Sequence, residues 1–150
     1  MTSEQIPEDK KDFYLKLRES ITEWIDTKAG ENNKYSEYLM FAPDFFYLLV
    51  KLSLDEQVNS LQKAKFIATI AYFISPVDLL PEFIFGPAGY FDDLILAAYT
   101  LNSYINKADP ELVRKYWTGD QDVLEITKHI IKSADNILGS GLVHNLRKLF

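Results

Sequence analysis

The side chains best suited to chemistry in this sequence are four carboxylates in one stretch of the chain. Asp78 and Glu82 lie four residues apart, and Asp92 and the adjacent Asp93 follow ten residues later. Carboxylate oxygens are the hard ligands that Mg²⁺, Ca²⁺ and Mn²⁺ prefer. Asp78, Asp92 and Asp93 are therefore the candidate ligands of a divalent cation, with Glu82 further from the ion.

These acids have no base in their own stretch of sequence. Residues 66–106 contain no Lys, Arg or His and carry four of the six net negative charges of the chain. Acids that converge in a low-dielectric site need a counter-charge. That charge would come from a divalent cation or from a base outside the segment, and the candidate bases are Lys63, Lys65, Lys107 and Arg114.

The same acids also fit a structural role at helix ends, which is the interpretation we favour. Ser75-Pro76-Val77-Asp78 has the spacing of a capping box, in which Ser75 caps a short helix and Asp78 reaches back to the Ser75 amide. Asp92 and Asp93 fall in the first turn of the next predicted helix, where a negative charge stabilises the helix dipole by about 0.3–1 kcal/mol. Ser75, Asp78 and Asp92 are the expected caps.

Other chemistry has little support. The absence of cysteine excludes disulfides, zinc–thiolate sites, iron–sulfur clusters and cysteine nucleophiles. No P-loop or dinucleotide-binding glycine motif occurs, and His129 and His144 belong to no catalytic motif. An acidic chain repels phosphate backbones, so nucleic acid is not an expected partner. We favour a protein without enzymatic activity, and without a cofactor unless the acids bind Mg²⁺, Ca²⁺ or Mn²⁺.

The elements that position these residues are predicted to be helices. Apolar residues recur at helical spacing, and no alternating run with hairpin turns occurs. The 150 residues, 47% of them apolar, suit one compact domain, and no linker or repeat divides residues 1–150. The prediction is an all-α bundle of about six to seven helices, with a Pro/Gly-rich turn before a buried central helix.

The predicted helices can be placed by their caps and breakers. They cover residues 7–28, 35–42, a stretch from Pro43, a stretch from the capping-box spacing at Ser53 to residue 74, 90–105 and 110–117. The next predicted helix begins after Asp120 or after Asp122 and runs to residue 137, and a last amphipathic segment covers 142–150. Residues 94–99 are apolar almost all round, which predicts that the helix from residue 90 is the central one.

The loop before that helix is a candidate docking patch. Residues 83–90 are apolar and punctuated by proline and glycine, and large exposed apolar patches mark binding sites. The candidate contact residues are Phe83, Ile84, Phe85, Tyr90 and Phe91. The partner would be a protein or a peripheral membrane surface, which the amphipathic segment 142–150 could also contact. The longest uncharged runs, 66–77 and 94–106, are too short to span a membrane.

A family pattern runs through this part of the chain. Tyr72, Ser75-Pro76, Asp78-Leu79 and Pro81-Glu82, followed by Gly89-Tyr90-Phe91-Asp92-Asp93, resemble the YkvA-like family, domain of unknown function 1232. Glu82 stands where that family more often has Asp. The resemblance covers residues 66–106 and implies a small helical, bacterial protein with no established reaction. Some relatives carry this segment beside predicted membrane spans, which keeps a membrane link open.

Three hypotheses follow for the function. The first, which we favour, is a soluble, cytoplasmic interaction module without enzymatic activity. The second is a divalent-metal-binding protein or metal-dependent enzyme that uses Asp78, Asp92 and Asp93. The third is a membrane-associated helical protein.

Overall fold

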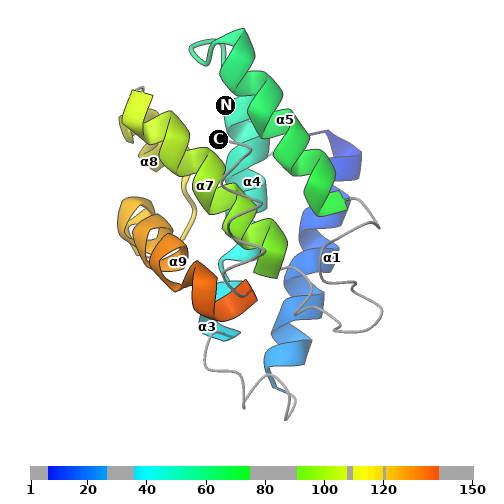
Figure 1. Cartoon of the computed structure of the whole chain (residues 1–150). Helices are drawn as coiled ribbons and strands as arrows, with labels where there is room; N and C mark the ends of the chain where they lie inside the picture. The colour runs from blue at the N-terminus through cyan, green and yellow to red at the C-terminus, as the bar shows by residue number, and fades with distance from the viewer. Residues whose placement is uncertain (1–6, 27–35, 75–90, 108–109, 120, 139–150) are drawn as a thin grey trace.

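A computed structural model of the chain describes residues 7–26, 36–74, 91–107, 110–119 and 121–138 (Figure 1). Within these ranges every regular element is a helix, and no strand occurs. The helices are α1 (Glu8–Ile25), α3 (Ser36–Leu39), α4 (Ala42–Leu54), α5 (Ser60–Ile74), α7 (Phe91–Lys107), α8 (Pro110–Tyr116) and α9 (Val123–Leu138). The prediction of an all-α bundle is confirmed.

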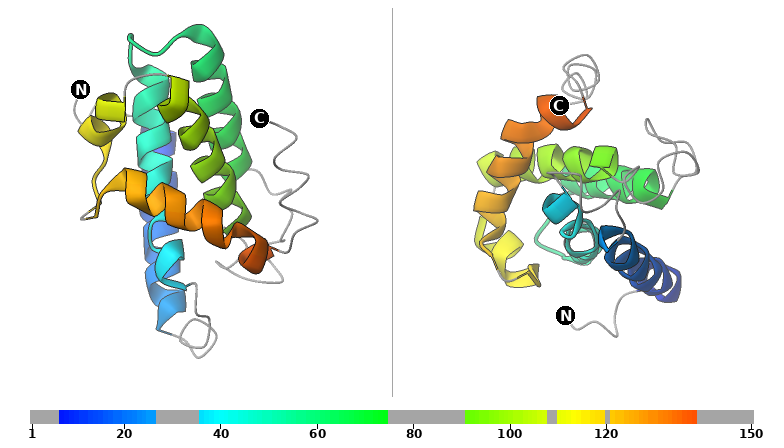
Figure 2. Two further views of the ribbon diagram at one scale, coloured as in Figure 1. Left: turned by 60° about the vertical axis from the view of Figure 1, so that its left-hand side comes forward. Right: turned by 90° about the horizontal axis from the view of Figure 1, so that it is seen from below.

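Two helices, α4 and α7, share the centre of the bundle. Nine of the 13 residues of α4 are buried, and α4 packs against α1, α5, α7 and α8. Residues 94–98 of α7 are all buried, and α7 packs against α4, α5, α8 and α9. Figure 2 shows the other helices arranged around this pair. The predicted burial of α7 is confirmed, whereas the equally central position of α4 was not predicted.

Aromatic side chains join the central helices to their neighbours. The Phe46 ring of α4 lies 4.8 Å from the Phe13 ring of α1 and 5.6 Å from the Phe73 ring of α5, measured between centroids. Phe66 of α5 meets Tyr104 of α7 edge-on at 5.3 Å. Such pairs contribute about 0.5–1.5 kcal/mol each beyond the area that they bury. They fix α1 and α5 on the core.

A buried pair of hydroxyl groups also joins α5 to α7. The Oγ1 atoms of Thr69 and Thr100 lie 3.0 Å apart. Each also lies 2.9 Å from a carbonyl oxygen of its own helix, that of Lys65 for Thr69 and that of Leu96 for Thr100. Because each hydroxyl has one hydrogen, the pair can make only two of these three hydrogen bonds at a time. One hydroxyl therefore donates to its carbonyl while the other donates across the helix pair.

The start of α5 differs from the prediction. The Ser53 hydroxyl donates to the Val50 carbonyl at 2.7 Å, and α4 continues to Leu54. The Asn59 side-chain oxygen accepts a hydrogen bond from the Gln62 amide at 2.9 Å and so caps α5. The capping-box spacing at Ser53 was therefore wrong as a helix start, because a serine hydroxyl can also bond back to its own helix.

A buried carboxylate fixes the turn between α4 and α5 to α8. Asp55 accepts hydrogen bonds from the Tyr116 hydroxyl and from the Gln57 amide, the latter at 2.7 Å. Burial raises the pKa of Asp55, but these hydrogen bonds and the charges of Lys115 and Lys63 outweigh it, so the pKa lies below its ordinary value. The bond to Asp55, together with burial, raises the pKa of Tyr116 to about 12.

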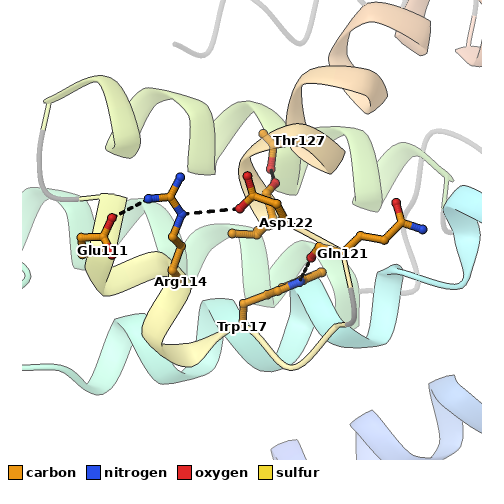
Figure 3. A network of polar contacts seen from close by, with 7 residues as sticks. Glu111, Arg114, Trp117, Gln121, Asp122 and Thr127 are labelled. Atoms are coloured by element: carbon orange, nitrogen blue, oxygen red, sulfur yellow. Dashed lines mark hydrogen bonds and ion pairs between the residues drawn. The ribbon is translucent and has the colours of Figure 1, made fainter.

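Polar contacts also set the connection between α8 and α9 (Figure 3). The Arg114 guanidinium contacts the Glu111 carboxylate and lies 3.5 Å from that of Asp122. These groups are largely exposed, so the ion pairs contribute little stability. The Trp117 indole donates to the Gln121 carbonyl at 2.7 Å. The predicted end of α8 near Tyr116 and start of α9 after Asp122 are confirmed.

The two faces of α5 can be tested with one pair of substitutions. Phe66→Ala should lower the free energy of unfolding by about 3–5 kcal/mol, because it empties a fully buried site. Leu61→Ala, on the same helix but largely exposed, should change it by less than about 0.5 kcal/mol. Urea unfolding followed by circular dichroism measures both. Equal losses would contradict the assignment of the faces.

Tyr116→Phe tests the buried hydrogen bond. It should lower the free energy of unfolding at neutral pH by about 1.5–3 kcal/mol, because an ionised acceptor loses its donor. The stability due to the raised pKa of Tyr116 is complete below its unfolded value of about 10 and is lost as the pH rises through about 12. The stability due to Asp55 is present above its unfolded pKa and is lost as the pH falls through its lowered folded value.

The difference in the free energy of unfolding between wild type and Tyr116→Phe should therefore shrink at low pH and at high pH. Urea unfolding at a series of fixed pH values measures this difference. Tyr14→Phe is the control, since the Tyr14 hydroxyl contacts exposed Arg18 at 3.2 Å. A difference that stays constant from neutral pH to about pH 12 would contradict this account.

Candidate interaction surface

The outer side of α5 is the most unusual surface of the described structure. α5 packs on α4 and α7 and lies at the edge of the bundle (Figure 1). Its buried side holds Gln62, Phe66, Thr69, Ile70 and Phe73. Six apolar residues on the opposite side are exposed, and we call them the α5 stripe: Leu61, Ala64, Ile67, Ala68, Ala71 and Ile74.

The α5 stripe is continuous and almost free of polar groups. Leu61, Ile67 and Ile74 are 66%, 56% and 42% exposed. At 3.6 residues per turn, the six residues cover an arc of about 140° along the whole helix. Ser60 is the one exposed polar residue of α5, and the half-buried Lys63 and Lys65 lie at the edges of the arc. Isolated exposed leucines are ordinary, but a continuous apolar row marks an interaction site.

The sequence contains a signal for this surface that belongs to no motif. Residues 61, 64, 68 and 71 are apolar at helical spacing, and so are 66, 70 and 73 on the other side. A helix with apolar residues on two opposite sides is expected to be covered on both. Only one side of α5 is covered within the described structure.

Of the four acids predicted to form a site, the structure describes the side chain of Asp93. It lies in the first turn of α7, as predicted, and is completely buried. Asp78 and Glu82 lie outside the described residues, together with Ser75 and with the side chain of Asp92. Asp93 is therefore part of the core rather than a solvated residue at a helix end.

The structure also holds a buried base that the sequence analysis missed. Lys51 of α4 is buried, and its ammonium lies 5.6 Å from the centroid of the Tyr47 ring, where a cation is attracted by the ring. The helix that carries Lys51 packs against the helix that carries Asp93. The core therefore contains both a base and an acid, whereas Lys107, one of the predicted bases, is exposed.

Two groups of predicted site residues remain predictions. Within the ranges that the structure covers, no three acidic or histidine side chains gather closely enough to hold a metal ion. Asp78, Glu82 and the side chain of Asp92 lie outside those ranges, so the cation site stays a prediction. The predicted docking residues Phe83, Ile84, Phe85 and Tyr90 also lie outside the described residues, as does the side chain of Phe91.

An open pocket of about 710 Å³ lies between α1, α3, the start of α4 and α9. Its lining includes the charged side chains of Arg18, Glu37 and Asp44 and the imidazole of His129. Asp44 accepts a hydrogen bond from the Thr118 hydroxyl at 3.0 Å, which ties the segment after α8 to α4. This mixed lining suits a polar ligand.

Gly119 forms part of the same pocket wall. A Cβ atom at this position would lie 2.5 Å from Cζ2 of Trp117, so a larger residue cannot pass the ring without a shift. The ring in turn packs on Phe45 of α4, with 5.2 Å between centroids. Glycine at 119 therefore allows the chain to cross Trp117 on its way to α9.

None of the helices in the described ranges has the length and apolar character that crossing a membrane requires.

Comparison with known proteins places the central segment in a family context. Residues 62–99 match the family model described as "Protein of unknown function (DUF1232)". An uncharacterized protein designated ORF9, from Methanothermobacter thermautotrophicus, is 23% identical over 107 residues, which is 71% of this chain and 73% of that protein. The comparison with solved structures found no match.

The matched range contains nearly all of α5 and the first half of α7, and therefore most of the α5 stripe together with Asp93. The resemblance to domain of unknown function 1232 is confirmed over residues 62–99 of this helical chain, which match that family's model.

Proposed function

We propose that this protein is an interaction module without enzymatic activity, and that the α5 stripe docks an apolar helix of a protein partner. The observation that carries the proposal is the exposure of Leu61, Ile67 and Ile74 in one row. Burying a Leu or Ile side chain completely contributes about 1.5–3 kcal/mol. A partner that covers this row would recover much of that free energy.

The shape of the α5 stripe favours a helix as the occupant. Ala64, Ala68 and Ala71 run along it, with Leu61 on one side and Ile67 and Ile74 on the other. Small central residues let a second helix approach to an interaxial distance of about 8 Å, and the larger side chains then enclose it.

A membrane surface is a less suitable occupant. Helices that lie in the membrane interface carry several basic residues on their polar side and large side chains on the apolar one. α5 has two lysines, three central alanines and no aromatic residue on the stripe, and the whole chain carries a net charge of -6. An anionic surface would repel most of this protein.

Ile67→Lys tests the proposal with a defined probe. The probe is a labelled amphipathic peptide helix with a Leu/Ala stripe flanked by glutamates, which complement Lys63 and Lys65. Fluorescence anisotropy should show binding to the wild type and binding at least about tenfold weaker to Ile67→Lys, since a charge would be buried. The free energy of unfolding should change by less than about 0.5 kcal/mol, because Ile67 is exposed.

Leu15→Lys is the matched control, because Leu15 is an exposed residue of a different helix, α1, and the change of charge is the same. It should leave peptide binding unchanged. The proposal fails if the wild type does not bind the peptide. It also fails if Ile67→Lys destabilises the fold by more than about 1 kcal/mol, because the chain itself would then cover the stripe.

A further inference from the structure

The α5 stripe has the same pattern in both directions along the helix. Its midpoint lies between Ile67 and Ala68. Leu61 and Ile74 are equally far from that point, and so are Ala64 and Ala71. From either end of the helix, a large side chain is therefore followed by a small one, then by the central pair Ile67 and Ala68, then by a small and a large side chain.

This pattern suits a two-fold contact. In a two-fold interface the same patch is used by both copies, so it must be complementary to itself. We infer that the α5 stripe docks the α5 stripe of a second copy of this chain, with the two helices antiparallel. This inference rests on the function proposed above and names the partner.

The antiparallel arrangement fixes which residues of the two copies lie level along the helix axes. Leu61 of one copy lies level with Ile74 of the other, Ala64 with Ala71, and Ile67 with Ala68. Ala64 and Ala71 lie nearest the middle of the arc, so these small residues face each other and allow close packing of the two helices. The large pairs at both ends close the contact against water.

The charges of α5 agree with this arrangement. Residues 57–77 contain no acid, so the repulsion between two acidic chains is weakest at this face. In the antiparallel alignment Lys63 lies level with residue 72 and Lys65 with residue 70 of the second copy. In a parallel alignment each lysine would lie level with its own counterpart.

The expected dimer is weak. The 15 residues of α5 form a helix about 22 Å long, and one such pair buries less than the roughly 800 Å² per partner of a standard interface. Sedimentation velocity should therefore show a monomer at about 10 µM and a growing dimer fraction toward about 1 mM. Ile67→Lys should remain monomeric over the whole range.

Cysteine cross-linking tests the register, and the chain has no cysteine of its own. Ala64→Cys and Ala71→Cys variants, distinguishable by mass, are mixed under mild oxidation. The mixed disulfide should dominate, because residues 64 and 71 of two copies face each other. Two copies of residue 64 lie about 10 Å apart along the axis, beyond the roughly 7 Å between Cα atoms that a disulfide spans.

Each outcome decides the inference. A mixed disulfide in excess of both self-linked products, and lost when Ile67→Lys is added to both chains, supports it. Dominant self-linked products indicate a parallel contact and overturn it. Linkage no greater than that of Leu15→Cys, with a monomer at all concentrations, also overturns it. In that case binding of the peptide helix still decides the proposed function separately.

Discussion

The burial of α4 is the constraint on which the rest of the structure depends. A helix that is apolar on nearly every side must be covered on every side, and α1, α5, α7 and α8 together provide that cover. Each surrounding helix then needs one apolar side toward α4 and is free to be polar elsewhere. α5 departs from this rule, because its outer side is as apolar as its inner one. That departure, rather than a catalytic motif, is the strongest functional signal in the part of the chain that the structure describes.

The apolar interior around the central helices also constrains the charged groups that lie in it. A charge in a low-dielectric interior is costly unless other groups stabilise it. Asp55 shows the solution, since the Tyr116 hydroxyl and the Gln57 amide stabilise its ionised form and lower its pKa. Lys51 and Asp93 place a base and an acid on two central helices that pack together. Acids that look like metal ligands in a sequence can therefore belong to the core.

The segment that matches the DUF1232 model contains both a buried acid and an exposed apolar row. Residues 62–99 include the buried Asp93 and most of the α5 stripe. The inferred partner, a second copy of the chain, is argued from the pattern of the row itself. Because a self-complementary patch needs only a second copy, dimer formation would cover the α5 stripe at high local concentration.

Local patterns in the sequence were enough to predict most helices. The spacing of Val123, Ile126, Ile130 and Ala134 predicted the buried side of α9, because helical periodicity is a property of neighbouring residues. The start of α5 was missed, because a serine such as Ser53 can either cap a helix or bond back within one. The sequence also shows that Lys51 is basic and that the α5 stripe is apolar. Whether each is covered was decided only by the tertiary structure, because burial depends on which helices pack alongside.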